Sequence, residues 1–106
     1  MDSFSEREKA FEAKFQHDEE LRFRVEAKAV KLFGTWAATQ LGLKGDEAET
    51  YAAKVLDADM AKAGISDVMD KVQKDFGAAG KSFSDHQLQN EFTIHLTAAK
   101  KAVMEG

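Results

Sequence analysis

The apolar residues of this chain recur at helical spacing, and no stretch alternates apolar and polar residues as a half-buried strand would. The longest apolar stripe begins after Glu20 and occupies one helical face at 100° per residue. Its members are Leu21, Val25, Ala29, Leu32, Phe33 and Trp36. Gly42 and Gly45 mark the end of this helix. We expect Trp36 to pack in the core rather than to form a ligand platform, with Gly34 letting a neighbouring helix approach closely.

Three further helices are predicted after these glycines. The first begins with Asp46 as N-cap and ends at Gly64; Ser66 caps the next, and Ser84 opens the last with Gln87 three residues later. Their apolar positions are Tyr51, Ala52, Val55, Leu56 and Met60; Val68, Met69, Val72 and Phe76; and Leu88, Phe92, Leu96, Ala99 and Val103, with His95 on the last stripe. Short connections between amphipathic helices are typical of a bundle. The predicted fold class is all-α, a four-helix bundle.

The segment before the apolar stripe has a different character. Residues 1–31 hold eight acidic and seven basic residues, yet Phe4, Phe11 and Phe15 share one helical face. A continuous helix from Ser3 to Leu41 would be about 58 Å long at ~1.5 Å per residue. The radius of gyration expected for a chain of this size is only ~13 Å. We therefore predict an extended or mobile N-terminal segment, residues 1–19, and a bundle domain, residues 20–106.

Composition excludes several classes of function. A net charge of −4 with both signs interspersed argues against a nucleic-acid binder and against a polybasic membrane-surface protein. The chain has no cysteine, so thiol chemistry and disulfides are absent. No 18-residue apolar run predicts membrane insertion, and the first residues lack the pattern of a secretory signal. We expect a cytoplasmic protein.

The pattern holds no catalytic or metal-binding motif, and we predict a non-enzyme without metal or cofactor. His17, His86 and His95 lack the spacing that places two imidazoles on one helical face for a metal. The acidic clusters at 46–49 and 57–59 do not fit an EF-hand loop. Weak binding of ADP or ATP stays open. His17 adjoins three acidic residues and is a candidate pH sensor, because histidine changes charge near neutral pH.

The three N-terminal phenylalanines allow two interpretations. They cap one end of the bundle, or another protein buries them. Arg7, Lys14, Asp18 and Arg22 fall close to the same helical face, and a dry intramolecular seam would have to accommodate their charges. An amphipathic helix in a polar-rimmed groove of a partner would place these charges at the rim, with the rings as central anchors. We favour the partner interpretation.

The same stretches resemble a known family. They are Phe4-x-x-Arg7-Glu8-Lys9-Ala10-Phe11-Glu12-Ala13-Lys14-Phe15, His17-Asp18-Glu19-Glu20-Leu21-x-Phe23 and Gly34-x-Trp36-Ala37-Ala38. They closely resemble the alphaproteobacterial ATPase inhibitor zeta-subunit family, and the similarity spans essentially the whole chain.

This resemblance implies a regulator that binds the catalytic head of the F-type ATP synthase, formed by alpha, beta and gamma subunits, on its cytoplasmic side. In that family a mobile N-terminal segment blocks ATP hydrolysis. Carried onto this chain, the partner-binding residues are Phe4, Arg7, Lys9, Phe11, Lys14 and Phe15. We expect a monomer when free. The alternatives are a helical module that binds ADP or ATP and a generic helical adaptor.

Overall fold

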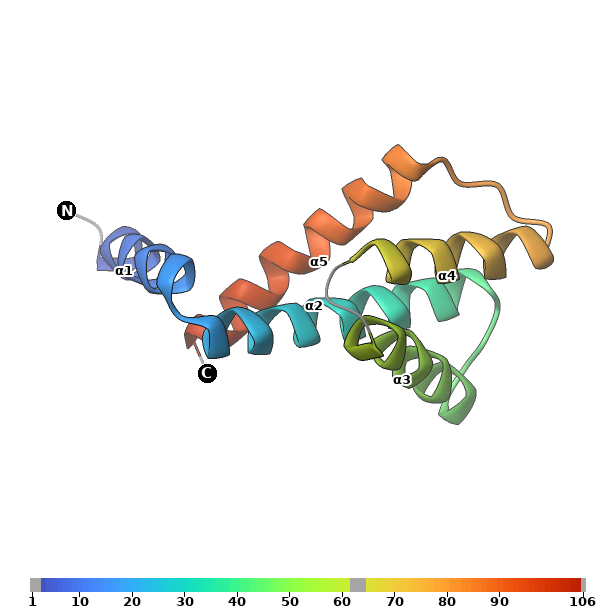
Figure 1. Cartoon of the computed structure of the whole chain (residues 1–106), viewed down its shortest axis with the longest axis horizontal. Helices are drawn as coiled ribbons and strands as arrows, with labels where there is room; N and C mark the ends of the chain where they lie inside the picture. Colours follow the sequence, from blue (N-terminus) through green and yellow to red (C-terminus); the bar gives the residue numbers. More distant parts are fainter. Residues whose placement is uncertain (1–2, 62–64, 106) are drawn as a thin grey trace.

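A computed structural model describes the backbone of residues 3–61 and 65–105, and the side chains of residues 6–58 and 65–105. Over these residues the chain forms five helices and no strand, which confirms the all-α prediction (Figure 1). The helices are α1 (Ser3–His17), α2 (Glu19–Gln40), α3 (Asp46–Ala61), α4 (Ser66–Ala78) and α5 (Asp85–Glu105). Helices α2, α4 and α5 run roughly along the long axis of the molecule, α3 lies obliquely beside α2, and α1 lies at one end (Figure 1).

The number of helices corrects the prediction of four, because the expected first helix is divided at Asp18. Asp18 has extended backbone angles, φ −108° and ψ 104°, and ends α1 at His17. Its Oδ1 accepts a hydrogen bond of 3.0 Å from the N–H of Leu21. This is N-cap geometry, and Glu19 and Glu20 place negative charge in the positive first turn of α2.

Helix α2 contacts all four of the other described helices. Its most extensive contacts are with α3 and α5, and it also touches α1 and α4. The predicted apolar stripe is confirmed, since Leu21, Val25, Ala29 and Phe33 are buried. The main core joins α2 to α3, α4 and α5 through Val30, Phe33, Ala37, Val55, Val68, Val72, Phe76 and Leu88. A smaller cluster of Val25, Ala29 and Ala99 lies between α2 and α5 on the side of α1.

Gly34 sets the distance between α2 and α3. A Cβ atom built on Gly34 would lie 3.0 Å from the Cα of Ala52 and 3.3 Å from the Cβ of Val55. Only glycine therefore fits this crossing without a shift of the neighbouring backbone. Two residues later, Trp36 packs against the main core, with its ring 5.6 Å from that of Phe33. The close approach of a neighbouring helix at Gly34 and the core packing of Trp36 are both confirmed.

The predicted helix boundaries hold at the last helix and differ at two earlier ones. The N–H of Ser84 donates to Oε1 of Gln87 at 2.8 Å, and the N–H of Gln87 donates to Oγ of Ser84 at 3.1 Å, which is a reciprocal capping box. Ser66 is the first residue of α4 rather than its cap, since Ile65 takes the N-cap position without a side-chain hydrogen bond. Asp46 is likewise already helical.

A cluster of three polar side chains links α3 to α4. The Tyr51 hydroxyl donates to Oδ2 of Asp75 at 2.8 Å, and Nζ of Lys71 lies 3.1 Å from the same oxygen. Burial, followed by the hydrogen bond and the negative charge of Asp75, raises the pKa of Tyr51 well above its ordinary value near 10. This hydroxyl therefore stays protonated in the folded protein at every physiological pH.

The molecule measures 49 × 28 × 27 Å along its principal axes. Its long dimension follows α2 and α5, with α1 extending one end (Figure 1). None of the described helices combines the length and the apolar character needed to cross a bilayer.

Candidate partner-binding site

The inner face of α1 is made by Phe11 and Phe15. Their rings stack with centroids 6.3 Å apart and planes inclined by 23°. Both are partly buried against the small cluster of Val25, Ala29 and Ala99. We call this contact the α1 seat: Phe11 and Phe15 on one side, the cluster between α2 and α5 on the other. It corresponds to the interpretation in which the rings cap one end of the bundle.

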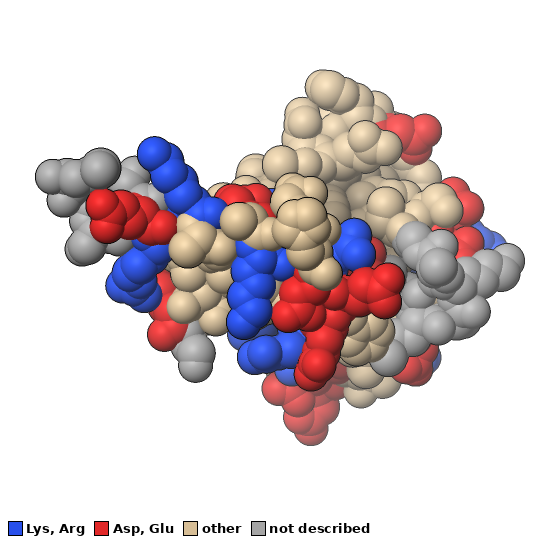
Figure 2. Space-filling view, turned by 60° about the vertical axis from the view of Figure 1, so that its left-hand side comes forward, with Lys and Arg blue, Asp and Glu red and all other residues tan. Residues whose placement is uncertain are grey.

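The other predicted site residues lie outside this contact. Arg7, Lys9, Lys14 and His17 are exposed on α1, and His17 is its last residue. The side chain of Phe4 lies outside the described residues. The structure thus brings two of the six predicted partner-binding residues together on one face and leaves three basic ones in solvent. Figure 2 shows acidic and basic side chains interspersed over one face of the molecule.

Lys100 on α5 also belongs to this site, although it is not among the predicted partner-binding residues. Its Nζ lies 3.4 Å from Oε1 of Glu12 and 4.6 Å from the centroid of the Phe15 ring. One ammonium thus contacts both a carboxylate and an aromatic ring of α1. A cation over an aromatic face is attracted by the ring quadrupole, and more strongly where water is partly excluded. The Lys100 side chain is 28% exposed, so water is only partly excluded here.

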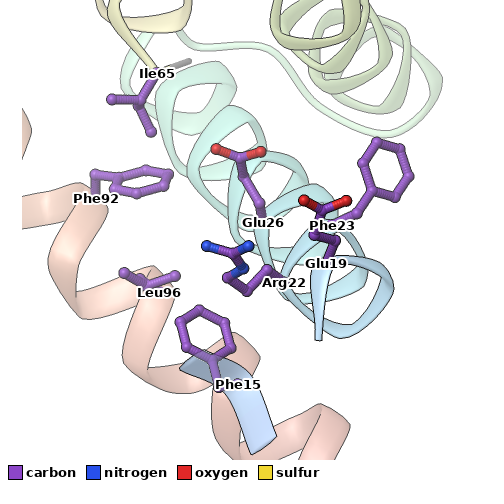
Figure 3. A pocket seen from close by; sticks show the side chains of 8 residues that line it. All are labelled: Phe15, Glu19, Arg22, Phe23, Glu26, Ile65, Phe92 and Leu96. Atoms are coloured by element: carbon purple, nitrogen blue, oxygen red, sulfur yellow. The ribbon is translucent and has the colours of Figure 1, made fainter. Parts of the chain in front are cut away.

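Two hollows flank the α1 seat. One, of about 240 Å³, lies between α1 and α5 and is lined by Glu8, Phe11, Glu12, Thr97, Lys100, Lys101 and Met104. It is smaller than the roughly 300 Å³ at which ligand pockets usually begin. The other, of about 590 Å³, is an open groove beside the last turn of α1 (Figure 3).

The larger groove has an apolar wall and a charged rim. Phe15, Phe92, Leu96 and Ile65 supply the apolar surface, while Glu19, Arg22 and Glu26 project from α2 (Figure 3). Phe23 also borders it and is 50% exposed, one of two large apolar side chains that stand out in solvent on the described surface. Arg22 lies at the edge of this groove, beside its apolar wall, which is the position expected of a charge at the rim of a binding surface.

The three histidines lie apart, on α1, at the start of α5 and in its middle. His95 is at the edge of the core, with its ring 6.3 Å from that of Phe33, and His86 is exposed. Among the described side chains, those of residues 6–58 and 65–105, no three acidic or histidine groups converge as a metal site would require.

The chain is similar to a known family and to solved structures. The family model described as ATPase inhibitor subunit zeta matches residues 1–102. A structure determined by solution NMR is similar over 80% of this chain and 96% of its own, with 35% sequence identity and a TM-score of 0.66. No curated protein matches the chain significantly.

Proposed function

The chain belongs to the ATPase inhibitor subunit zeta family, and from this premise we propose that it stops ATP hydrolysis by inserting its N-terminal arm into the catalytic head of the F-type ATP synthase. The arm is residues 1–19, and the bundle of residues 20–106 holds it in place. The chain itself performs no chemistry. It acts from the cytoplasmic side of the membrane-bound enzyme and is a monomer when free.

One observation carries this proposal: two stacked aromatic rings lie on one face of a short helix that a single residue, Asp18, separates from the rest of the fold. Such a helix can present both rings to a groove in another protein. In many interfaces a few aromatic side chains contribute most of the binding free energy. The residues that surround them contribute little energy but exclude water. The exposed Arg7, Lys9 and Lys14 then lie where a polar rim would be, and they add electrostatic steering to the docking.

The direct test is ATP hydrolysis by the cognate catalytic head with and without this protein. We expect the full chain to inhibit and a version lacking the first 19 residues to lose most of its potency. Equal potency of both versions would refute the arm mechanism. Absence of inhibition by the full chain would refute the function itself.

Single substitutions refine the test. Phe11→Ala or Phe15→Ala should weaken inhibition by about tenfold or more, because truncating an interface anchor commonly costs more than ~2 kcal/mol. Ile94→Ala is the control, since Ile94 is an exposed apolar residue on α5 that lies outside the arm and lines neither hollow beside it. Melting of the bundle should change little, because both rings contact only its end. Loss of the whole fold in both arm variants would make these rings core residues and contradict the proposal.

A further inference from the structure

The α1 seat occupies the surface that the proposed function assigns to a partner. Phe11 and Phe15 are partly buried against Val25, Ala29 and Ala99 of the same chain. The same rings cannot lie in this seam and in a groove of another protein at once. Binding through the rings therefore requires that α1 leave its seat first.

Lys100 holds the seated helix from the opposite side of the seam. It pairs with Glu12 at 3.4 Å and lies over the Phe15 ring at 4.6 Å, so both of its contacts reach α1. Glu12 is only half-buried, with 47% of its side chain exposed. A contact of this kind adds a modest stabilisation that can be overcome by a larger aromatic interface elsewhere.

Asp18 gives α1 a way to leave without unfolding the bundle. On one side of the bend the N–H of Asp18 donates to the Lys14 carbonyl at 2.9 Å, and on the other the N–H of Arg22 donates to the Asp18 carbonyl at 3.0 Å. Helical hydrogen bonding is thus intact up to the bend on both sides. A change of backbone angles at Asp18 alone would redirect α1, and in a continuous helix the N–H of Leu21 would pair with the His17 carbonyl in place of Oδ1 of Asp18.

We propose that the α1 seat is an autoinhibitory contact: Lys100 keeps α1 in its seat between α2 and α5, with Asp18 as the pivot, and the arm inhibits only after α1 is released. This inference rests on the proposed function. The apparent affinity of a ligand for a protein is reduced by the fraction of molecules in the competent state. Weakening the seat without touching the rings should therefore increase inhibitory potency.

The first experiment measures the concentration of full-length protein that halves ATP hydrolysis, for Lys100→Gln and for its matched control Lys74→Gln. Lys74 is exposed on α4 and lines neither hollow beside α1, so the control removes the same charge away from the α1 seat. Loss of a partly exposed ion pair and a cation–π contact should lower the half-inhibiting concentration about threefold to tenfold for Lys100→Gln. Lys74→Gln should change it little. Reduced or unchanged potency of Lys100→Gln would overturn the inference.

A double-mutant cycle identifies the contact. Glu12→Gln should also increase potency, and the double variant should gain less than the product of the two single effects, because both remove one interaction. If the two effects multiply, Lys100 and Glu12 act separately, and the inference that their contact holds α1 in its seat is overturned.

The second measurement follows the seat in the free protein, with no ATPase present. Ala13 is exposed on α1, and the chain has no cysteine, so Ala13→Cys accepts a single spin label. Amide signals of residues 97–104 on α5 should be broadened by this label, and the broadening should weaken when Lys100→Gln is added. Unchanged broadening would overturn the inference even if the full chain inhibits. Weakened broadening would support it even if the proposed target proved wrong.

Discussion

The close crossing of α2 and α3 at Gly34 allows a prediction for Gly34→Ala. Two opposing contributions decide whether this substitution raises or lowers the free energy of unfolding. Gly34→Ala gains helix propensity, worth roughly 0.8–1.0 kcal/mol in a helix interior. Its new methyl would lie 3.0 Å from the Cα of Ala52, which is backbone and not the flexible end of a side chain. The two helices would have to move apart by a few tenths of an ångström.

Overpacking of this kind costs roughly 1–3 kcal/mol in well-packed cores. Subtracting the propensity gain leaves a net loss, for which we expect about 1 kcal/mol. For a domain of this size the melting temperature should then fall by roughly 4–8 °C. Gly77→Ala is the matched control: Gly77 is helical in α4, and a Cβ there meets nothing within 4 Å. The control should gain roughly 0.5–1 kcal/mol.

Both variants are compared with the parent chain by urea unfolding followed by circular dichroism at 222 nm. The expected result is opposite signs, with Gly34→Ala less stable and Gly77→Ala more stable than the parent chain. A Gly34→Ala variant as stable as Gly77→Ala would refute the reasoning, because it would show that α3 yields to the methyl group at no cost.

Two further predictions concern a helix start and a buried hydroxyl. Ser84→Ala removes one half of the Ser84–Gln87 capping box and should lower the unfolding free energy by about 1 kcal/mol; a change under about 0.3 kcal/mol in urea unfolding would contradict it. Folding raises the pKa of Tyr51, chiefly by burial and then by the hydrogen bond to Asp75. The unfolded chain therefore loses this proton first, and the unfolding free energy should fall as pH rises above about 10, more steeply than in Tyr51→Phe. Parallel curves for the two proteins between about pH 9 and 11.5 would contradict it.

The helices were largely predictable because their apolar stripes face a single core. The α2 stripe and the Ser84–Gln87 box appear in the structure as the spacing indicates. The bend at Asp18 was not predicted, although Asp18 followed by Glu19 and Glu20 is itself a helix-start signal. Helical periodicity continues across that point and masks the cap. Ser66 shows the opposite error, where a capping residue type turned out to lie inside the helix.

The candidate site was predictable in part. Spacing alone places Phe11 and Phe15 on one face, and the structure shows them stacked there. Their seat between α2 and α5 depends on tertiary geometry that no local pattern contains. Lys100 is the clearest example: its position near the end of α5 suggests an interaction with the helix dipole, whereas its contacts are with α1, 85 or more residues earlier in the chain.

The position of Trp36 has a practical consequence for studying these motions. The chain has one tryptophan, and its ring lies 5.6 Å from Phe83 and 5.9 Å from Phe76, partly buried against the main core and away from the α1 seat. Intrinsic fluorescence is therefore a reporter of the bundle alone. Departure of α1 from its seat should leave the emission unchanged, whereas opening of the bundle should shift it to longer wavelength. The protein thus carries its own optical means of distinguishing arm release from unfolding.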